Sequence, residues 1–167
     1  MHLKVGDMVV YPAHGVGQIE SIDDKSQIKD GHRFVNLRIL ENGMQIMIPS
    51  HNLKEVGLRP LISKKEVERL FEQLKLPPVY AEASNWNRRH RQYLDKLKTG
   101  SLKDVCDVLR ELMTMRAEKE LSFGERKLLD TARTLLIKEV AMVTRRNEER
   151  IGQELDSIFK PPKVHSA

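Results

Sequence analysis

The spacing of apolar residues changes near residue 63, and this change constrains the fold of the 167-residue chain more than any other feature. Before it, apolar and polar side chains tend to alternate, as they do in a strand with one buried face. After it, apolar residues recur every three or four positions, which is typical of amphipathic helices. Strands followed by helices, rather than alternating with them, predict an α+β fold with two different parts.

The first part, residues 1–60, contains several short segments that predict strands. Asn42 and Gly43 give a tight-turn signal between two of them, which therefore predict a β-hairpin. Short strands joined by glycine-rich turns predict a small β-barrel, which often keeps an edge strand that a partner can extend. The predicted strands are 8–11, 16–22, 33–40 and 44–48.

The second part predicts a compact helical bundle with short loops. Ser63 and Glu66 match a capping box, in which each side chain bonds the backbone N–H of the other residue. Ser122 and Glu125 match a second box. Helices are predicted to begin at these two boxes and to cover about 85–97, 102–118 and 148–159. We expect a helix and linker over 61–84, a helical domain over 85–160 and a disordered tail over 161–167.

The composition predicts a cytoplasmic protein. No apolar run approaches the roughly 18 residues that a membrane span needs. The first residues lack the charged and then apolar pattern of a signal peptide. A single cysteine excludes an intrachain disulfide, and Cys106 lies among apolar residues. We interpret it as a small core residue, with a reactive thiol as the alternative.

Positive charge is concentrated in one segment. The chain has a net charge of +5, whereas residues 1–60 contain equal numbers of acidic and basic side chains. Residues 84–103 carry six basic residues and only Asp95 as an acid. This excess predicts an anionic partner, with nucleic acid as the first candidate, although a solvated basic face explains the charge equally well. The six residues are Arg88, Arg89, Arg91, Lys96, Lys98 and Lys103.

The only tryptophan of the chain, Trp86, lies in this basic segment. Helical spacing puts Trp86 on the same face as Tyr93 and Leu97, which predicts a core position; His90 shares that face and is interpreted as packing. A position in the first helical turn beside arginines supports the alternative of an exposed ring. Such a ring can stack on a base or wedge at a base step while guanidinium groups hold phosphates.

Motifs of enzyme classes are missing from the sequence. The histidines have no close metal-ligand spacing, and there is no cysteine cluster. Neither a nucleophile elbow nor a phosphate-binding P-loop is present. We therefore predict a protein that is not an enzyme and that needs neither a metal nor another cofactor.

Several motifs, in the right order over about residues 3–159, resemble the CarD/CdnL family of bacterial transcription regulators. Each motif is modest alone, and together they are specific. Those in the first part are Lys4-Val5-Gly6-Asp7, Val9-Val10-Tyr11-Pro12, His14-Gly15 and Val56-Gly57-Leu58-Arg59. Those in the second part are Asn85-Trp86-Asn87-Arg88-Arg89, Lys96-Leu97 and Glu118-Lys119-Glu120-Leu121-Ser122 with Glu125-Arg126-Lys127.

The resemblance implies a Tudor-like N-terminal barrel that binds the β subunit of bacterial RNA polymerase by strand addition. The helical domain would face promoter DNA at the upstream edge of the transcription bubble. There Trp86 would wedge into the minor groove and basic residues would contact the backbone, without reading base sequence. The result would be a longer-lived open promoter complex, formed by a protein that is nucleoid-associated through the polymerase and is itself a monomer.

Two sets of site residues follow from the resemblance. Lys25 keeps the positive charge of a family polymerase contact, whereas Met47 replaces one, and Arg38 and Lys29 are the candidates to compensate. The DNA-facing set is Asn85, Trp86, Arg88, Arg89, Arg91 and Lys96, and the polymerase-facing set is Lys25, Arg38, Ile46, Met47 and Ile48. The alternative function is a protein–protein adaptor whose barrel binds a partner and whose helical domain does not engage DNA.

Overall fold

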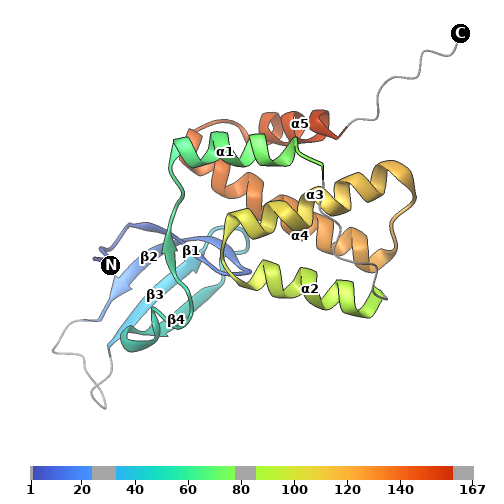
Figure 1. The fold of residues 1–167 in the computed structure, drawn as a ribbon. Helices are drawn as coiled ribbons and strands as arrows, with labels where there is room; N and C mark the ends of the chain where they lie inside the picture. Colours follow the sequence, from blue (N-terminus) through green and yellow to red (C-terminus); the bar gives the residue numbers. More distant parts are fainter. Residues whose placement is uncertain (1, 24–32, 78–85, 160–167) are drawn as a thin grey trace, which may run out of the picture.

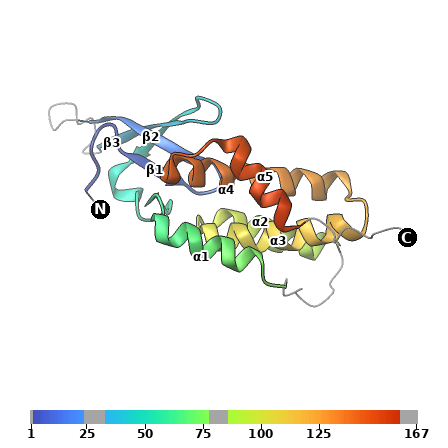
Figure 2. The same ribbon diagram turned by 90° about the horizontal axis from the view of Figure 1, so that it is seen from above.

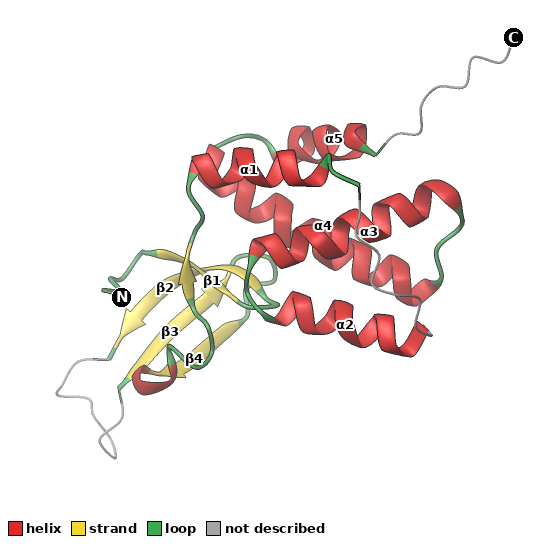
Figure 3. Cartoon of the chain, in the orientation of Figure 1, coloured by secondary structure: helices red, strands yellow, loops and turns green. Residues whose placement is uncertain are grey.

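The computed structural model describes residues 2–23, 33–77 and 86–159 (Figure 1). Within these ranges, five strands and a short 3-10 helix are followed by five α-helices. Figure 3 shows the strands in one layer and the helices gathered beside it. This arrangement confirms the predicted α+β fold.

The strands form one antiparallel sheet in the order β4-β3-β2-β1-β5. The predicted hairpin is confirmed: β3 and β4 pair across a turn in which Gly43 has a φ of 71°. All four predicted strands are present within two residues of the expected bounds. The strands are β1 (Met8–Tyr11), β2 (Gly15–Ile22), β3 (Phe34–Ile39), β4 (Gln45–Pro49) and β5 (Arg59–Pro60).

The sheet is open and keeps two edge strands, as a small barrel often does. In the described chain, β4 and β5 are the two edges and do not pair with each other. Strand β5 pairs only two residues with β1 and ends in Pro60, which has no N–H for a further strand. The connection between β4 and β5 packs Leu53, Val56 and Leu58 against the apolar face of the sheet. That face is therefore covered by a loop rather than by closure of the sheet.

The five helices begin and end close to their predicted bounds. Both capping boxes are formed: Ser63 and Glu66 begin α1, and Ser122 and Glu125 begin α4. In each box the serine hydroxyl accepts the glutamate N–H at 3.2 Å. The helices are α1 (Lys64–Leu74), α2 (Trp86–Lys98), α3 (Leu102–Glu118), α4 (Phe123–Thr144) and α5 (Glu148–Ile158).

Helix α3 is the centre of the bundle and packs against α1, α2 and α4. Cys106 on α3 is fully buried, and this burial raises the pKa of its thiol to about 12. The interpretation as a core residue is therefore confirmed. Helix α1 adds four apolar side chains to the same core, so it packs as part of the bundle. Figure 2 shows the bundle extending away from one end of the sheet.

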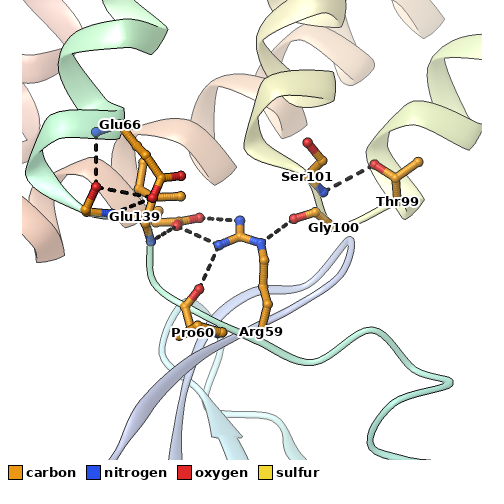
Figure 4. A network of polar contacts seen from close by, with 9 residues as sticks. Arg59, Pro60, Glu66, Thr99, Gly100, Ser101 and Glu139 are labelled. Atoms are coloured by element: carbon orange, nitrogen blue, oxygen red, sulfur yellow. Dashed lines mark hydrogen bonds and ion pairs between the residues drawn. The ribbon is translucent and has the colours of Figure 1, made fainter. Parts of the chain in front are cut away.

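A buried ion pair joins the sheet to the bundle (Figure 4). The terminal nitrogens of Arg59 in β5 donate to the two carboxylate oxygens of Glu139 in α4, at 2.8 and 2.7 Å. Glu139 is only 2% exposed and also accepts the N–H of Ile62 at 2.9 Å. Arg59 further donates to the carbonyls of Pro60 and Gly100. One guanidinium group therefore connects β5, α4 and the turn between α2 and α3.

The turn between α2 and α3 also rests directly on the sheet. Gly100 has a φ of +80°, a conformation that side chains other than glycine rarely adopt. A Cβ at this position would lie 2.8 Å from the Cγ of Pro12, in the turn between β1 and β2. Glycine is therefore needed both for the turn and for the close approach of the bundle to the sheet.

We predict that Glu139→Gln lowers the free energy of unfolding by about 3 kcal/mol, because it leaves a half-buried arginine without its negative partner. Urea denaturation of the full chain measures this loss. The control is Glu148→Gln, since Glu148 is half-exposed and pairs with Lys138 at 2.8 Å. An exposed pair of this kind contributes less than about 1 kcal/mol. Equal losses in the two variants would contradict the central role of the Arg59–Glu139 pair.

Candidate functional site

The outer face of α2 is basic. Arg88 and Arg91 are exposed, and Lys98 lies on the same side two turns further along the helix. Asp95 is the only acid on this face. Two arginines of the predicted DNA-facing set therefore point away from the bundle, as a contact with an external anion requires.

Two other basic residues of the predicted set lie differently. Lys96 is half-exposed, and its Nζ lies 3.7 Å from Asp107 on α3. Arg89 is half-buried, and its Nε has no solvent-accessible surface. The structure thus separates an outward pair, Arg88 and Arg91, from two cations that lie toward the bundle.

Trp86 is the first residue of α2, one residue after the predicted start. Its side chain and the whole of Asn85 lie outside the described part of the chain, so the core and exposed interpretations of Trp86 both stay predictions. The spacing argument is confirmed for Tyr93 and Leu97, which are buried, and His90 is half-buried on the same side.

Phe123 is an exposed aromatic residue that the sequence analysis missed. It is 77% exposed at the first position of α4, and the exposed Arg126 and Lys127 follow at three and four residues. That spacing puts all three on one side of the helix. Figure 1 shows that α4 begins at the same end of the bundle as α2. These three residues form an exposed patch at the start of α4. An aromatic residue inside a capping box, followed by two cations, is the signal that could have identified it.

Glu125 connects this patch to the buried part of the bundle. It is 5% exposed, and its Oε1 accepts the N–H of Ser122 at 3.0 Å. Burial alone would raise the pKa of Glu125. Hydrogen bonds with the backbone and side chain of Ser122, and the charges of Lys119 and Arg89, outweigh burial and hold the pKa below its usual value. The carboxylate is therefore charged at neutral pH.

The edge strand β4 can accept another strand. Ile39 and Met44 share a backbone hydrogen bond of 2.8 Å, and so do Arg33 and Ser50. Because such pairs alternate along an antiparallel ladder, the backbone groups of Gln45 and Met47 point away from β3. Among the described residues no strand pairs with that outer side. The opposite edge, β5, has only two residues, whereas β4 has five, so β4 is the edge that suits strand addition.

The residues predicted to bind polymerase divide between the two faces of the sheet. Met47 is 63% exposed, and Arg38 on the same face forms an ion pair with Glu20. Ile48 is buried in the sheet core and Ile46 packs against that core. The backbone groups of both residues point toward β3, so neither offers hydrogen bonds at the outer side of β4. Lys25 lies outside the described residues.

A cavity of about 380 Å³ lies between the sheet and the helices α4 and α5. Its walls are mainly apolar, and Lys138 at its rim binds Glu41 at 3.2 Å and Glu148 at 2.8 Å. Through these two ion pairs, Lys138 of α4 connects the β3–β4 hairpin to α5.

In the described ranges no cluster of three or more His, Cys, Asp or Glu side chains could hold a metal ion. No helix in those ranges has the length and apolarity to cross a membrane.

Comparison with known proteins agrees with this division of the chain. Residues 3–62 match the CarD-like/TRCF RID domain, and residues 52–156 match the CarD C-terminal domain. The chain belongs to the CarD family. It is 32% identical over 151 residues to the Bacillus subtilis (strain 168) protein named "Putative transcription factor YdeB", covering 89% of this chain and 96% of that protein. The resemblance predicted from the sequence motifs is confirmed.

The two CarD-family matches overlap over residues 52–62. This short segment contains β5 and Arg59, whose side chain binds Glu139. The residues at which the two matches meet are therefore those that attach the sheet to the bundle.

We predict that the charge of Glu125 stabilises the fold at neutral pH but not in acid. At pH 7, Glu125→Gln should unfold more easily than the natural chain by roughly 0.5–1 kcal/mol, because a charged acid stabilises a helix N-terminus. The difference in free energy of unfolding between the natural chain and Glu125→Gln should shrink as the pH falls below about 4.3. It should disappear once the pH passes the lower pKa of the folded state.

Denaturant titrations between pH 7 and pH 3 measure this effect. Glu120→Gln is the control, because it removes an exposed negative charge from the same end of α4. A difference between Glu125→Gln and the natural chain that does not depend on pH would refute the electrostatic explanation.

Proposed function

We propose that this CarD-family protein is a transcription regulator that binds RNA polymerase through the β4 edge and promoter DNA through α2. It would prolong the life of the open promoter complex. The observation that carries the proposal is the outward basic face of α2, on the helix that Trp86 begins, in a chain of the CarD family.

The polymerase contact is proposed at β4 because of its backbone. The outward groups of Gln45 and Met47 offer hydrogen bonds to an extended segment of the polymerase β subunit, and the exposed face of the hairpin adds Arg38. Family membership supports polymerase as the partner, since residues 3–62 match the RID domain. Strand addition needs no matching side chain at Met47, because the main chain supplies the hydrogen bonds.

The DNA contact is proposed to be weak and independent of base sequence. Arg88 and Arg91 would hold phosphates, while Phe123 with Arg126 and Lys127 would form a second contact at the same end of the bundle. Each phosphate contact contributes a salt dependence of about 0.9 in the slope of log K against log salt. A few such contacts do not hold DNA firmly at physiological salt. Attachment to the polymerase would raise the effective concentration of DNA near this surface.

Trp86 would act only where the DNA strands separate. A stacked or wedged ring contributes on the order of 1–3 kcal/mol. If this contact exists only in the open complex, it shifts the balance between closed and open promoters by about 5- to 150-fold. Because no base is read, the effect would extend over many promoters.

We predict that Trp86→Ala shortens the lifetime of the open complex by about tenfold and leaves polymerase binding unchanged, because the ring is proposed to contact DNA alone. Competitor-challenge experiments with polymerase and a promoter fragment measure that lifetime. Replacing Gln92, an exposed neutral residue of α2, with alanine is the control. An unchanged lifetime with retained polymerase binding would favour the adaptor function.

We predict that Met47→Pro abolishes binding to the polymerase β subunit but keeps the fold, because the N–H that proline removes points away from β3. Met47→Ala removes the side chain and keeps the N–H, so it should bind almost as well as the natural protein. Binding is measured by titrating the β subunit, and folding by circular dichroism. Normal binding by a folded Met47→Pro protein would exclude strand addition at this edge.

A further inference from the structure

The three arginines near the start of α2 do not share one environment. Arg88 and Arg91 lie on the exposed side of the helix. Arg89 lies four residues before Tyr93 and eight before Leu97, both of which are buried in the bundle core. Helical spacing therefore puts Arg89 on the inner side. Its side chain is half-buried, and its Nε is buried without a hydrogen-bond partner in the described chain.

The helices that pack against α2 present buried acids on the same side. Glu111 of α3 and Glu125 of α4 are both buried. Burial comes first among the causes that raise the pKa of Tyr93, and the charge of Glu111 adds to it. In the described chain the Oε2 of Glu125 is buried without a hydrogen-bond partner, while its Oε1 is occupied by Ser122. Buried carboxylates without a nearby cation are strongly unfavourable. Arg89 on α2 is one of two cations whose charge lowers the pKa of Glu125, and Lys119 at the end of α3 is the other.

The effect of Arg89 on its neighbours is consistent with this position. Burial and the charge of Glu111 raise the pKa of Tyr93, and the positive charge of Arg89 opposes that rise. Arg89 also helps to lower the pKa of Glu125. It is therefore within electrostatic reach of residues on both its own helix and α4.

We propose that Arg89 is a positioning residue that fixes the first turn of α2 against the buried acids of α3 and α4, and that it does not contact DNA phosphates. Trp86 lies three residues before Arg89 in the same turn. The first turn of a helix lacks part of its backbone hydrogen bonding and frays unless a side chain holds it. Arg89 would thus give Trp86 a defined position before DNA arrives, which lowers the ordering cost of binding.

This inference rests on the proposed function only for the role of Trp86, so its test begins with the free full-length protein. Arg89→Gln, Glu125→Gln and the double variant form a double-mutant cycle in urea unfolding. Glutamine at 125 can still accept the N–H of Ser122, so the capping box is retained. We expect the unfolding constants to be coupled by at least about threefold. Arg88→Gln, the same change at the neighbouring outward position, should not couple with Glu125→Gln.

The fluorescence of the single tryptophan reports directly on the first turn of α2. Arg89→Gln should lower the fluorescence anisotropy of Trp86, while Arg88→Gln should leave it unchanged. Arg89→Lys, which keeps the charge, should restore part of the anisotropy. A loss of stability without a change in anisotropy would overturn the positioning role.

Salt titration of binding to a forked promoter duplex separates positioning from phosphate contact. Arg88→Gln should lower the salt slope by about 0.9, whereas Arg89→Gln should weaken binding and keep the slope. A slope lowered equally by Arg89→Gln, or no coupling to Glu125, would overturn the inference. If neither Trp86→Ala nor Arg88→Gln affects the open complex, the proposed function fails. The coupling and the anisotropy would then still decide the role of Arg89.

Discussion

The arrangement of the two parts depends on the ion pair between Arg59 and Glu139. Glu139 is buried in α4, and the guanidinium group reaches it from the last strand of the sheet while also binding the turn that ends α2. A regulator held by one partner and acting on another needs a fixed geometry between its two surfaces, because tethering increases effective concentration only where both sites can be reached. The Arg59–Glu139 pair therefore helps to fix the orientation of α2 relative to the β4 edge.

This ion pair determines how the sheet is oriented on the bundle more than it adds net stability. Burying two charges costs about as much as their attraction returns, and well-packed apolar residues often stabilise a fold equally well. An apolar contact would tolerate sliding between sheet and bundle. The bidentate contact, with a third hydrogen bond from Ile62, defines one orientation. The close approach of Gly100 to Pro12 adds a steric limit to the same joint.

The sequence predicted what local signals determine and missed what depends on distant contacts. Asn42 with Gly43, and the serine–glutamate boxes, act within a few residues, so the hairpin and the helix starts were predicted correctly. Strand β5 was missed because it forms only by pairing of Arg59 and Pro60 with the distant Val9 and Val10. For the site, charge density identified the basic helix but treated its cations alike. The pairing of Lys96 with Asp107 arises from the packing of α2 on α3, which no local pattern shows.

The same packing explains why a row of cations on one helix is not one surface. Successive residues of a helix point about 100° apart, so neighbouring arginines face solvent and core in turn. Solvent-facing cations can contact phosphates, and the contribution of such contacts falls as salt rises. A cation beside buried carboxylates is screened far less and holds the helix in place at any salt concentration. A basic segment can therefore divide its charge between holding a helix and binding a partner, and these are the uses that we propose for Arg89 and Arg88, respectively.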